Sequence, residues 1–106
     1  MLTESLICRA VAKVVAAANS PLKVILFGSY ARGEADSGSD LDLIVVEREI
    51  VDPVSEYLKV HSAVSGFGVG VDILLMTERE FEKKRDWWTT PVYWAVREGK
   101  VLYESK

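Results

Sequence analysis

The sequence predicts an α/β (α+β) fold, in which a small mixed sheet of three to four strands carries helices packed on one face. Three short, largely apolar runs rich in β-branched residues indicate the strands, at residues 24–27, 40–46 and 69–76. Segments with apolar residues at helical spacing lie before, between and after these runs. We expect the helices of such an alternating chain to bury their apolar faces against the sheet.

Length and charge restrict the class of protein. The chain has 106 residues, of which 49% are hydrophobic, and this suits one domain over residues 1–106. The net charge of −3 argues against a long nucleic acid as partner. No apolar run approaches the roughly 20 residues that cross a membrane. The start lacks a signal-peptide pattern, so we expect a cytoplasmic location and no membrane partner.

The first third of the chain predicts a helix, a strand and a sharp turn. The first helix is expected over residues 3–18, because its apolar residues recur at helical spacing: Leu6, Ile7, Ala10, Val11, Val14, Val15 and Ala18. Pro21 follows the end of this helix. After the first strand, Gly28 allows a sharp turn, and we expect a short helix over residues 30–33.

Capping signals mark the helices of the second half. They are Asp52-Pro53 for a helix to about residue 64, Thr77 with Glu80 as a capping box, and Thr90-Pro91 for a last helix that ends at Gly99. His61 lies in the first of these helices and is expected to be packed or solvated, since no metal-ligand spacing surrounds it. Residues 101–103 predict a short edge strand.

The motif that suggests chemistry begins directly after the first strand. Gly28-Ser29 is followed, after ten residues, by Asp40-Leu41-Asp42. Gly28 lets a ligand approach the backbone, and we expect Ser29 to cap the next helical turn, where free N–H groups favour phosphate. Side chains alternate along a strand, so Asp40 and Asp42 share one face. Asp72 joins them if the third strand lies beside the second.

Such carboxylates indicate a cation. Two of them about 5 Å apart repel by roughly 3 kcal/mol at an effective dielectric near 20. Divalent cations such as Mg²⁺ are commonly held by carboxylates together with the phosphates of a substrate. The spacing therefore predicts a metal and phosphate site at this end of the sheet.

Three plainer interpretations fit less well. A P-loop would need Gly-Lys-Ser/Thr after the glycines. The segment from Asp36 places acidic residues at positions of a calcium-binding EF-hand, but Leu41 stands where that loop needs glycine. Ordinary turn chemistry explains Asp36 well. It explains the set of Asp40, Asp42 and Asp72 poorly.

The string GSYARGEADSGSDLDL resembles the nucleotidyltransferase superfamily to which DNA polymerase beta belongs. It looks most like the minimal nucleotidyltransferases found as antitoxin partners of HEPN-domain toxins. The resemblance implies a polymerase-beta-like fold in which Asp40, Asp42 and Asp72 hold two Mg²⁺ ions. Asp72 would also act as base for the attacking hydroxyl, or orient it. Gly28 and Ser29 would hold the β- and γ-phosphates, with Arg32 as a further phosphate or structural contact.

The same resemblance implies an activity. The chain would transfer AMP from ATP, its nucleoside triphosphate substrate, to a tyrosine hydroxyl of a partner HEPN toxin. Bulk and negative charge added near the toxin's active site would then block RNA. One alternative is an antitoxin that neutralises its partner by contact alone. Another is transfer to a small molecule, for which so small a chain would have to form a homo-oligomer.

One aromatic segment stays open between two roles. Trp87, Trp88, Tyr93 and Trp94 are dense for so small a domain. They are either a helix-packing cluster in the core or a surface for a partner, since Trp and Tyr dominate binding hot spots.

Overall fold

The computed structural model describes residues 2–105, and a four-stranded mixed sheet runs through its centre. The elements are α1 (Glu4–Ala17), β1 (Pro21–Phe27), α2 (Gly28–Arg32), β2 (Leu41–Glu47), α3 (Pro53–Ala63), β3 (Val71–Thr77), α4 (Glu78–Lys84), α5 (Pro91–Glu98) and β4 (Lys100–Glu104). The strand order is β3-β2-β1-β4. β1 is antiparallel to β2 and β4, whereas β2 and β3 are parallel. The predicted α/β fold class is confirmed.

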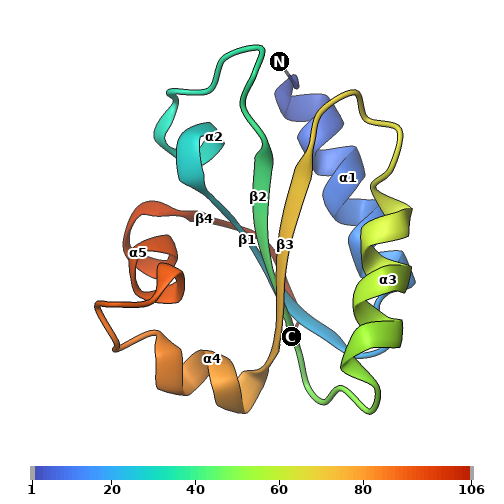
Figure 1. Cartoon of the computed structure of the whole chain (residues 1–106), viewed down its shortest axis with the longest axis vertical. Coiled ribbons are helices and arrows are strands. Elements are labelled where there is room, and N and C mark those ends of the chain that lie inside the picture. The colour runs from blue at the N-terminus through green and yellow to red at the C-terminus, as the bar shows by residue number, and fades with distance from the viewer. Residues whose placement is uncertain (1, 106) are drawn as a thin grey trace.

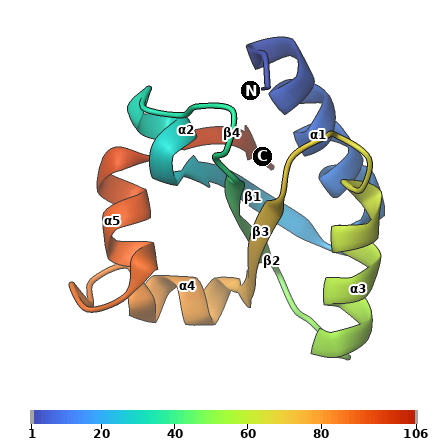
Figure 2. The ribbon, with the colours of Figure 1, turned by 45° about the horizontal axis from the view of Figure 1, so that its top comes forward.

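The helices cover both faces of the sheet, so the expectation that they pack on one face is wrong. α1 and α3 lie on one side, and α4 and α5 lie on the other (Figures 1 and 2). Along β2, Leu43 and Val45 join the core under α1 and α3, while Ile44 joins the core under α4 and α5. All three side chains are fully buried. A central strand that is apolar at consecutive positions needs cover on both faces, and this signal was present in residues 43–46.

The predicted helix starts are confirmed by side-chain caps. The caps are Thr3 to Leu6 N–H, Asp52 to Ser55 N–H, Thr90 to Tyr93 N–H, and the full capping box of Thr77 and Glu80. Each cap satisfies a free N–H group and contributes about 1 kcal/mol to helix stability. Ser29 is different, because it lies inside α2 rather than at its cap. Phe27 occupies the cap position without a side-chain hydrogen bond, so the expected role of Ser29 as a cap is wrong.

Two carboxyl side chains are buried against each other where β2 meets α3. Glu47 is 0% exposed and Glu56 is 5% exposed. Burial, and then hydrogen bonding to Glu56, raise the pKa of Glu47. Burial opposes ionisation of Glu56, but hydrogen bonds from Glu47, the Asn19 N–H and Lys59 outweigh it and lower its pKa. The contact between the two carboxyl groups therefore favours the protonated form of Glu47 and the ionised form of Glu56.

This pair ties three elements together. The Ser20 N–H donates to Glu47 Oε1 at 2.9 Å, and the Asn19 N–H donates to Glu56 Oε2 at 2.9 Å. The turn between α1 and β1 is thus joined to the end of β2 and to α3. In the sequence, Glu47 reads only as a charged end to its strand, because nothing local marks it as buried.

The aromatic segment lies on the surface. Trp87, Trp88 and Trp94 are 56%, 69% and 50% exposed. The core interpretation is therefore wrong for these three rings. His61 is packed, as expected: its Nε2 lies 3.1 Å from the Val71 carbonyl, and its ring stacks on Tyr57. None of the helices between residues 2 and 105 has the length and apolar character to cross a membrane.

Candidate functional site

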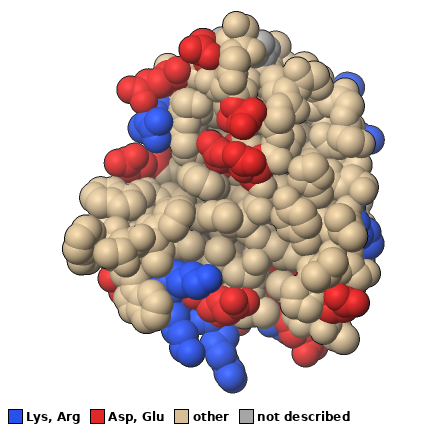
Figure 3. Space-filling view, in the orientation of Figure 1, with Lys and Arg blue, Asp and Glu red and all other residues tan. Residues whose placement is uncertain are grey.

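The parallel pairing of β2 and β3 brings two of the predicted acids together. Asp42 and Asp72 are direct partners in the register of the two strands. Both lie near the start of their strands, next to the loops that lead into them. Acidic atoms gather over the upper ends of β2 and β3 in the space-filling view (Figure 3). The third strand thus lies beside the second, as the interpretation of Asp72 required.

The environment of Asp42 opposes a negative charge. Burial, the charge of Asp72, hydrogen bonding with Asp72 and the charge of Asp40 together raise the pKa of Asp42 to about 6. The charge of Arg32 acts in the opposite direction. A proton therefore reduces repulsion at a place where a cation would do the same. Carboxylate oxygens are also the ligands that Mg²⁺ prefers, so these residues fit such an ion.

Gly28 brings the backbone of α2 against the same carboxylate. It follows β1, whose last residue, Phe27, pairs with Asp42. Gly28 has a φ of +74°, and a Cβ there would overlap the carboxylate of Asp42. Only glycine meets both conditions, because other residues rarely adopt this φ and all carry a Cβ. The glycine of the motif thus permits the approach between α2 and Asp42.

Asp40 lies just outside the strand that was expected to contain it. β2 begins at Leu41, whose N–H donates to the Gly70 carbonyl at 2.8 Å. A Cβ at Gly70 would overlap the carboxylate of Asp40, so this side chain lies against the loop before β3. Within residues 2–105 no group of three acidic, His or Cys side chains is gathered closely enough to form a metal site. The structure pairs Asp42 with Asp72 and leaves Asp40 beside them.

The other motif residues lie in α2, the helix that begins at Gly28 beside Asp42. Ser29 is half-buried in the first turn of α2. Arg32 is exposed in the last turn, and its Nε donates to Glu34 Oε1 at 2.6 Å. Arg32 also feels the charges of Glu98 and Asp42, which together with Glu34 raise its pKa against the opposing effect of desolvation. Its guanidinium thus remains charged beside the acids.

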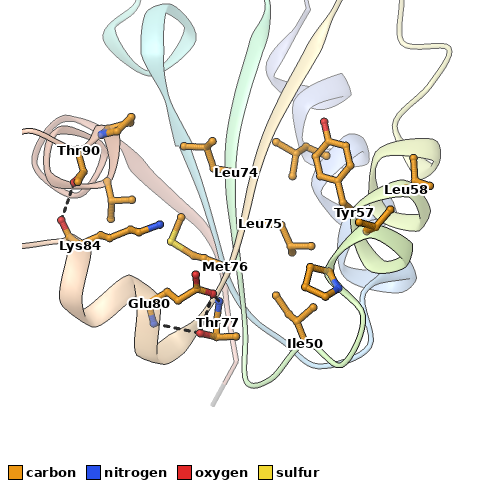
Figure 4. Close-up of a pocket in the computed structure, with 15 residues that line it drawn as sticks. Ile50, Tyr57, Leu58, Leu74, Leu75, Met76, Thr77, Glu80, Lys84 and Thr90 are labelled. Atoms are coloured by element: carbon orange, nitrogen blue, oxygen red, sulfur yellow. Dashed lines mark hydrogen bonds between the residues drawn. The ribbon is translucent and has the colours of Figure 1, made fainter.

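A larger cavity lies away from these residues. It is an apolar groove of about 650 Å³ along β3, between α3 and the start of α5 (Figure 4). Its walls include Tyr57, Leu58, Leu75 and Val92, but none of the predicted site residues. A smaller pocket of about 230 Å³ adjoins the site and is lined by Phe27, Gly28, Arg32 and four residues of α5. Sequence reasoning missed this pocket, because the packing of α5 beside α2 has no local signal.

Comparisons with known proteins show the family of this chain. Residues 8–97 match the family described as Nucleotidyltransferase domain. A Methanocaldococcus jannaschii protein named "putative protein adenylyltransferase" is 35% identical over 81 residues, which are 76% of this chain and 77% of that protein. A second protein of the same name and organism is 40% identical over 53 residues, half of this chain and 52% of its own length.

Solved structures share the fold at lower identity. A chain from a toxin–antitoxin complex with AMP-PNP is 20% identical with a TM-score of 0.68, over 93% of this chain and 74% of its own length. A chain from the complex of tri-AMPylated Shewanella oneidensis HEPN toxin with MNT antitoxin is 19% identical with a TM-score of 0.63. That match covers 97% of this chain and 74% of the other. At these identities the likeness establishes the fold.

Proposed function

This chain belongs to the nucleotidyltransferase domain family, and on that premise we propose that it is a Mg²⁺-dependent protein adenylyltransferase. Its substrate is ATP, and its acceptor is a tyrosine hydroxyl of a partner HEPN toxin. The observation that carries the proposal is the paired position of Asp42 and Asp72 beside Gly28. The relatives named as protein adenylyltransferases support the choice of a protein acceptor.

Each residue of the motif has a role in this proposal. Asp40, Asp42 and Asp72 hold two Mg²⁺ ions, for which they supply hard carboxylate oxygens. When bound, the ions supply positive charge that stabilises the attacking and leaving oxygens. The backbone at Gly28 and the hydroxyl of Ser29 bind the β- and γ-phosphates. Arg32 adds a positive charge toward the same phosphates.

The transfer forms one bond and breaks one bond. The acceptor oxygen bonds to the α-phosphorus of ATP, and the bond from that phosphorus to the bridging oxygen breaks, so pyrophosphate leaves. Asp72 accepts the hydroxyl proton or orients the hydroxyl for attack. Asp72 is exposed at the start of β3, and this position suits an acceptor that a second protein delivers. The product carries AMP on the tyrosine oxygen.

The HEPN partner is proposed from two observations of different kind. Structures with this fold include an MNT antitoxin in complex with an AMPylated HEPN toxin. The exposed rings of Trp87 and Trp88 give this chain an apolar surface of the kind that binding partners cover. The cytoplasmic location and a homo-oligomeric state stay predictions.

The test is incubation of the chain with α-labelled ATP, Mg²⁺ and the candidate toxin. We expect the label on the toxin and its loss after substitution of the acceptor tyrosine by phenylalanine. The double variant Asp40→Ala, Asp42→Ala is the control. Neutralisation of the toxin without label, retained by this double variant, would show an antitoxin that acts by contact alone. Label on a small molecule in the absence of any protein partner would overturn the choice of acceptor.

A further inference from the structure

A small pocket opens directly beside the proposed phosphate site. Its volume is about 230 Å³, below the roughly 300 Å³ at which pockets begin to enclose whole drug-sized ligands. It is lined by Phe27, Gly28, Arg32, Pro91, Trp94 and Glu98, among others. The pocket thus begins where β1 passes into α2 and ends at α5. It has room for an aromatic ring system and not for a complete nucleoside triphosphate.

The lining favours an uncharged ring over phosphate. Phe27, Pro91 and Trp94 give it apolar walls, and Glu98 adds a negative charge that repels phosphate oxygens. The positive group of the lining, Arg32, is already engaged with Glu34 and also feels the charge of Asp42. The two parts of an intact bound nucleotide therefore occupy different places. The phosphates lie at the carboxylates and Gly28, and the nucleoside enters the pocket.

Trp94 is held in place although half of it is exposed. Its Nε1 donates to the Trp88 carbonyl at 2.9 Å. Its ring meets the Tyr93 ring edge-on, with 5.0 Å between the two ring centroids. Its hydrogen-bonding group is satisfied by the protein, so binding a ring against its face leaves no donor unpaired. An indole of fixed orientation also loses little entropy when a second ring stacks on it.

We propose that this pocket receives the nucleobase of the substrate and that Trp94 is the residue on which the base stacks. This inference rests on the proposed function, because it places the base relative to the proposed phosphate site. Stacking acts through the face of the ring, which every base possesses, so Trp94 contributes affinity for nucleotides over bare polyphosphate.

The test compares ATP with inorganic tripolyphosphate, each with Mg²⁺, by titration calorimetry on the whole chain. We expect Trp94→Leu to weaken ATP binding roughly 5- to 150-fold, the range for loss of one base–aromatic stack. Tripolyphosphate binding should stay unchanged, and Trp94→Phe should restore most of the ATP affinity. The control is Tyr57→Leu, because Tyr57 is an aromatic residue of α3 that is 37% exposed and does not line the pocket. It should leave both affinities unchanged.

Several outcomes would overturn the inference. The first is an ATP affinity that Trp94→Leu leaves unaltered, and the second is an equal loss of affinity for ATP and tripolyphosphate. The third is a loss of AMP transfer with normal ATP binding, which would assign the pocket to the acceptor side chain. If Trp94→Leu does not fold, tryptophan fluorescence of the wild-type chain and Trp94→Phe decides: ATP must quench an emission that the variant lacks. ATP binding that depends on Trp94 without any transfer would leave this inference standing and contradict the proposed function.

Discussion

Asp42 and Asp72 lie opposite each other on two parallel strands, and the charge of Asp72 raises the cost of ionising Asp42. The pKa of Asp42 rises to about 6 through burial and through its acidic neighbours. Such a pair has no packing role that two apolar residues would not fill better. The energetic penalty is explained if the pair serves a cation and its phosphate ligand.

Replacing Asp42 or Asp40 by Asn should abolish AMP transfer and leave the fold intact. Each substitution removes a proposed metal ligand and also removes a charge that repels its neighbours in the absence of cations. We expect the melting temperature without Mg²⁺ to stay equal or to rise slightly. The measurement is label transfer together with thermal unfolding. Full activity in either variant would exclude that residue from the metal site.

The stability of the chain without divalent cations should fall as the pH rises toward neutrality. The pKa of Asp42 is about 6 in the fold and 3.8 for the ordinary side chain, so the folded state binds its proton more tightly. This contribution is fully present below about pH 3.8 and is lost as the pH rises through about 6. Urea unfolding between pH 4 and 7 measures it. The Asp42→Asn variant should show a weaker dependence, and identical profiles would contradict the shift.

Gly28→Ala should destabilise the chain more than Gly33→Ala. Both glycines have positive φ values, +74° and +72°, which cost another residue about 1–2 kcal/mol. A Cβ at Gly33 has no heavy atom within 4 Å, whereas one at Gly28 overlaps the Asp42 carboxylate. The difference between the two unfolding free energies therefore reports the contact with Asp42. Equal losses would mean that α2 moves away from the carboxylate without cost.

Glu47→Gln should be tolerated, whereas Glu47→Ala should cost about 3 kcal/mol of unfolding free energy. The amide of Gln still donates to Glu56 and still accepts from the Ser20 N–H. Alanine removes both interactions and leaves buried polar groups without partners. Chemical denaturation of the two variants tests this. Similar losses in both would show that Glu47 is ionised rather than protonated in the fold.

Ser29→Ala should weaken nucleotide binding by about 1–2 kcal/mol, the value of one charge-assisted hydrogen bond. The hydroxyl lies in the first turn of α2, where it is proposed to contact the β- and γ-phosphates. Ser62→Ala on the exposed surface of α3 is the control. An affinity equal to that of the control would remove Ser29 from the site.

Local features of the sequence predicted most of the elements. Helix starts at Asp52, Thr77 and Thr90 were recognisable because a cap acts within three residues of its partner. Strand ends were less well predicted: β1 begins at Pro21 rather than residue 24, and β2 excludes Asp40. Hydrogen bonds to neighbouring strands decide these ends, and those partners are distant in sequence.

Burial was the property that the sequence described least well. The sequence suggested that Glu47 closed a strand with charge, but it is fully buried against Glu56; the tryptophans could have been core, but they are exposed. Helices expected on one face of the sheet occupy both. In each case the outcome depends on what packs against the residue, and that is a long-range property.

The sequence by itself determined which chemical groups this chain has: a glycine-serine turn after a strand, and acids at positions 40, 42 and 72. The tertiary structure alone decided that β3 runs parallel to β2 with Asp72 opposite Asp42, and that α5 places Trp94 in a pocket that begins at Gly28. The reason is physical. Spacing along a strand fixes which side chains share a face, but pairing between strands is decided by burial of the whole sheet.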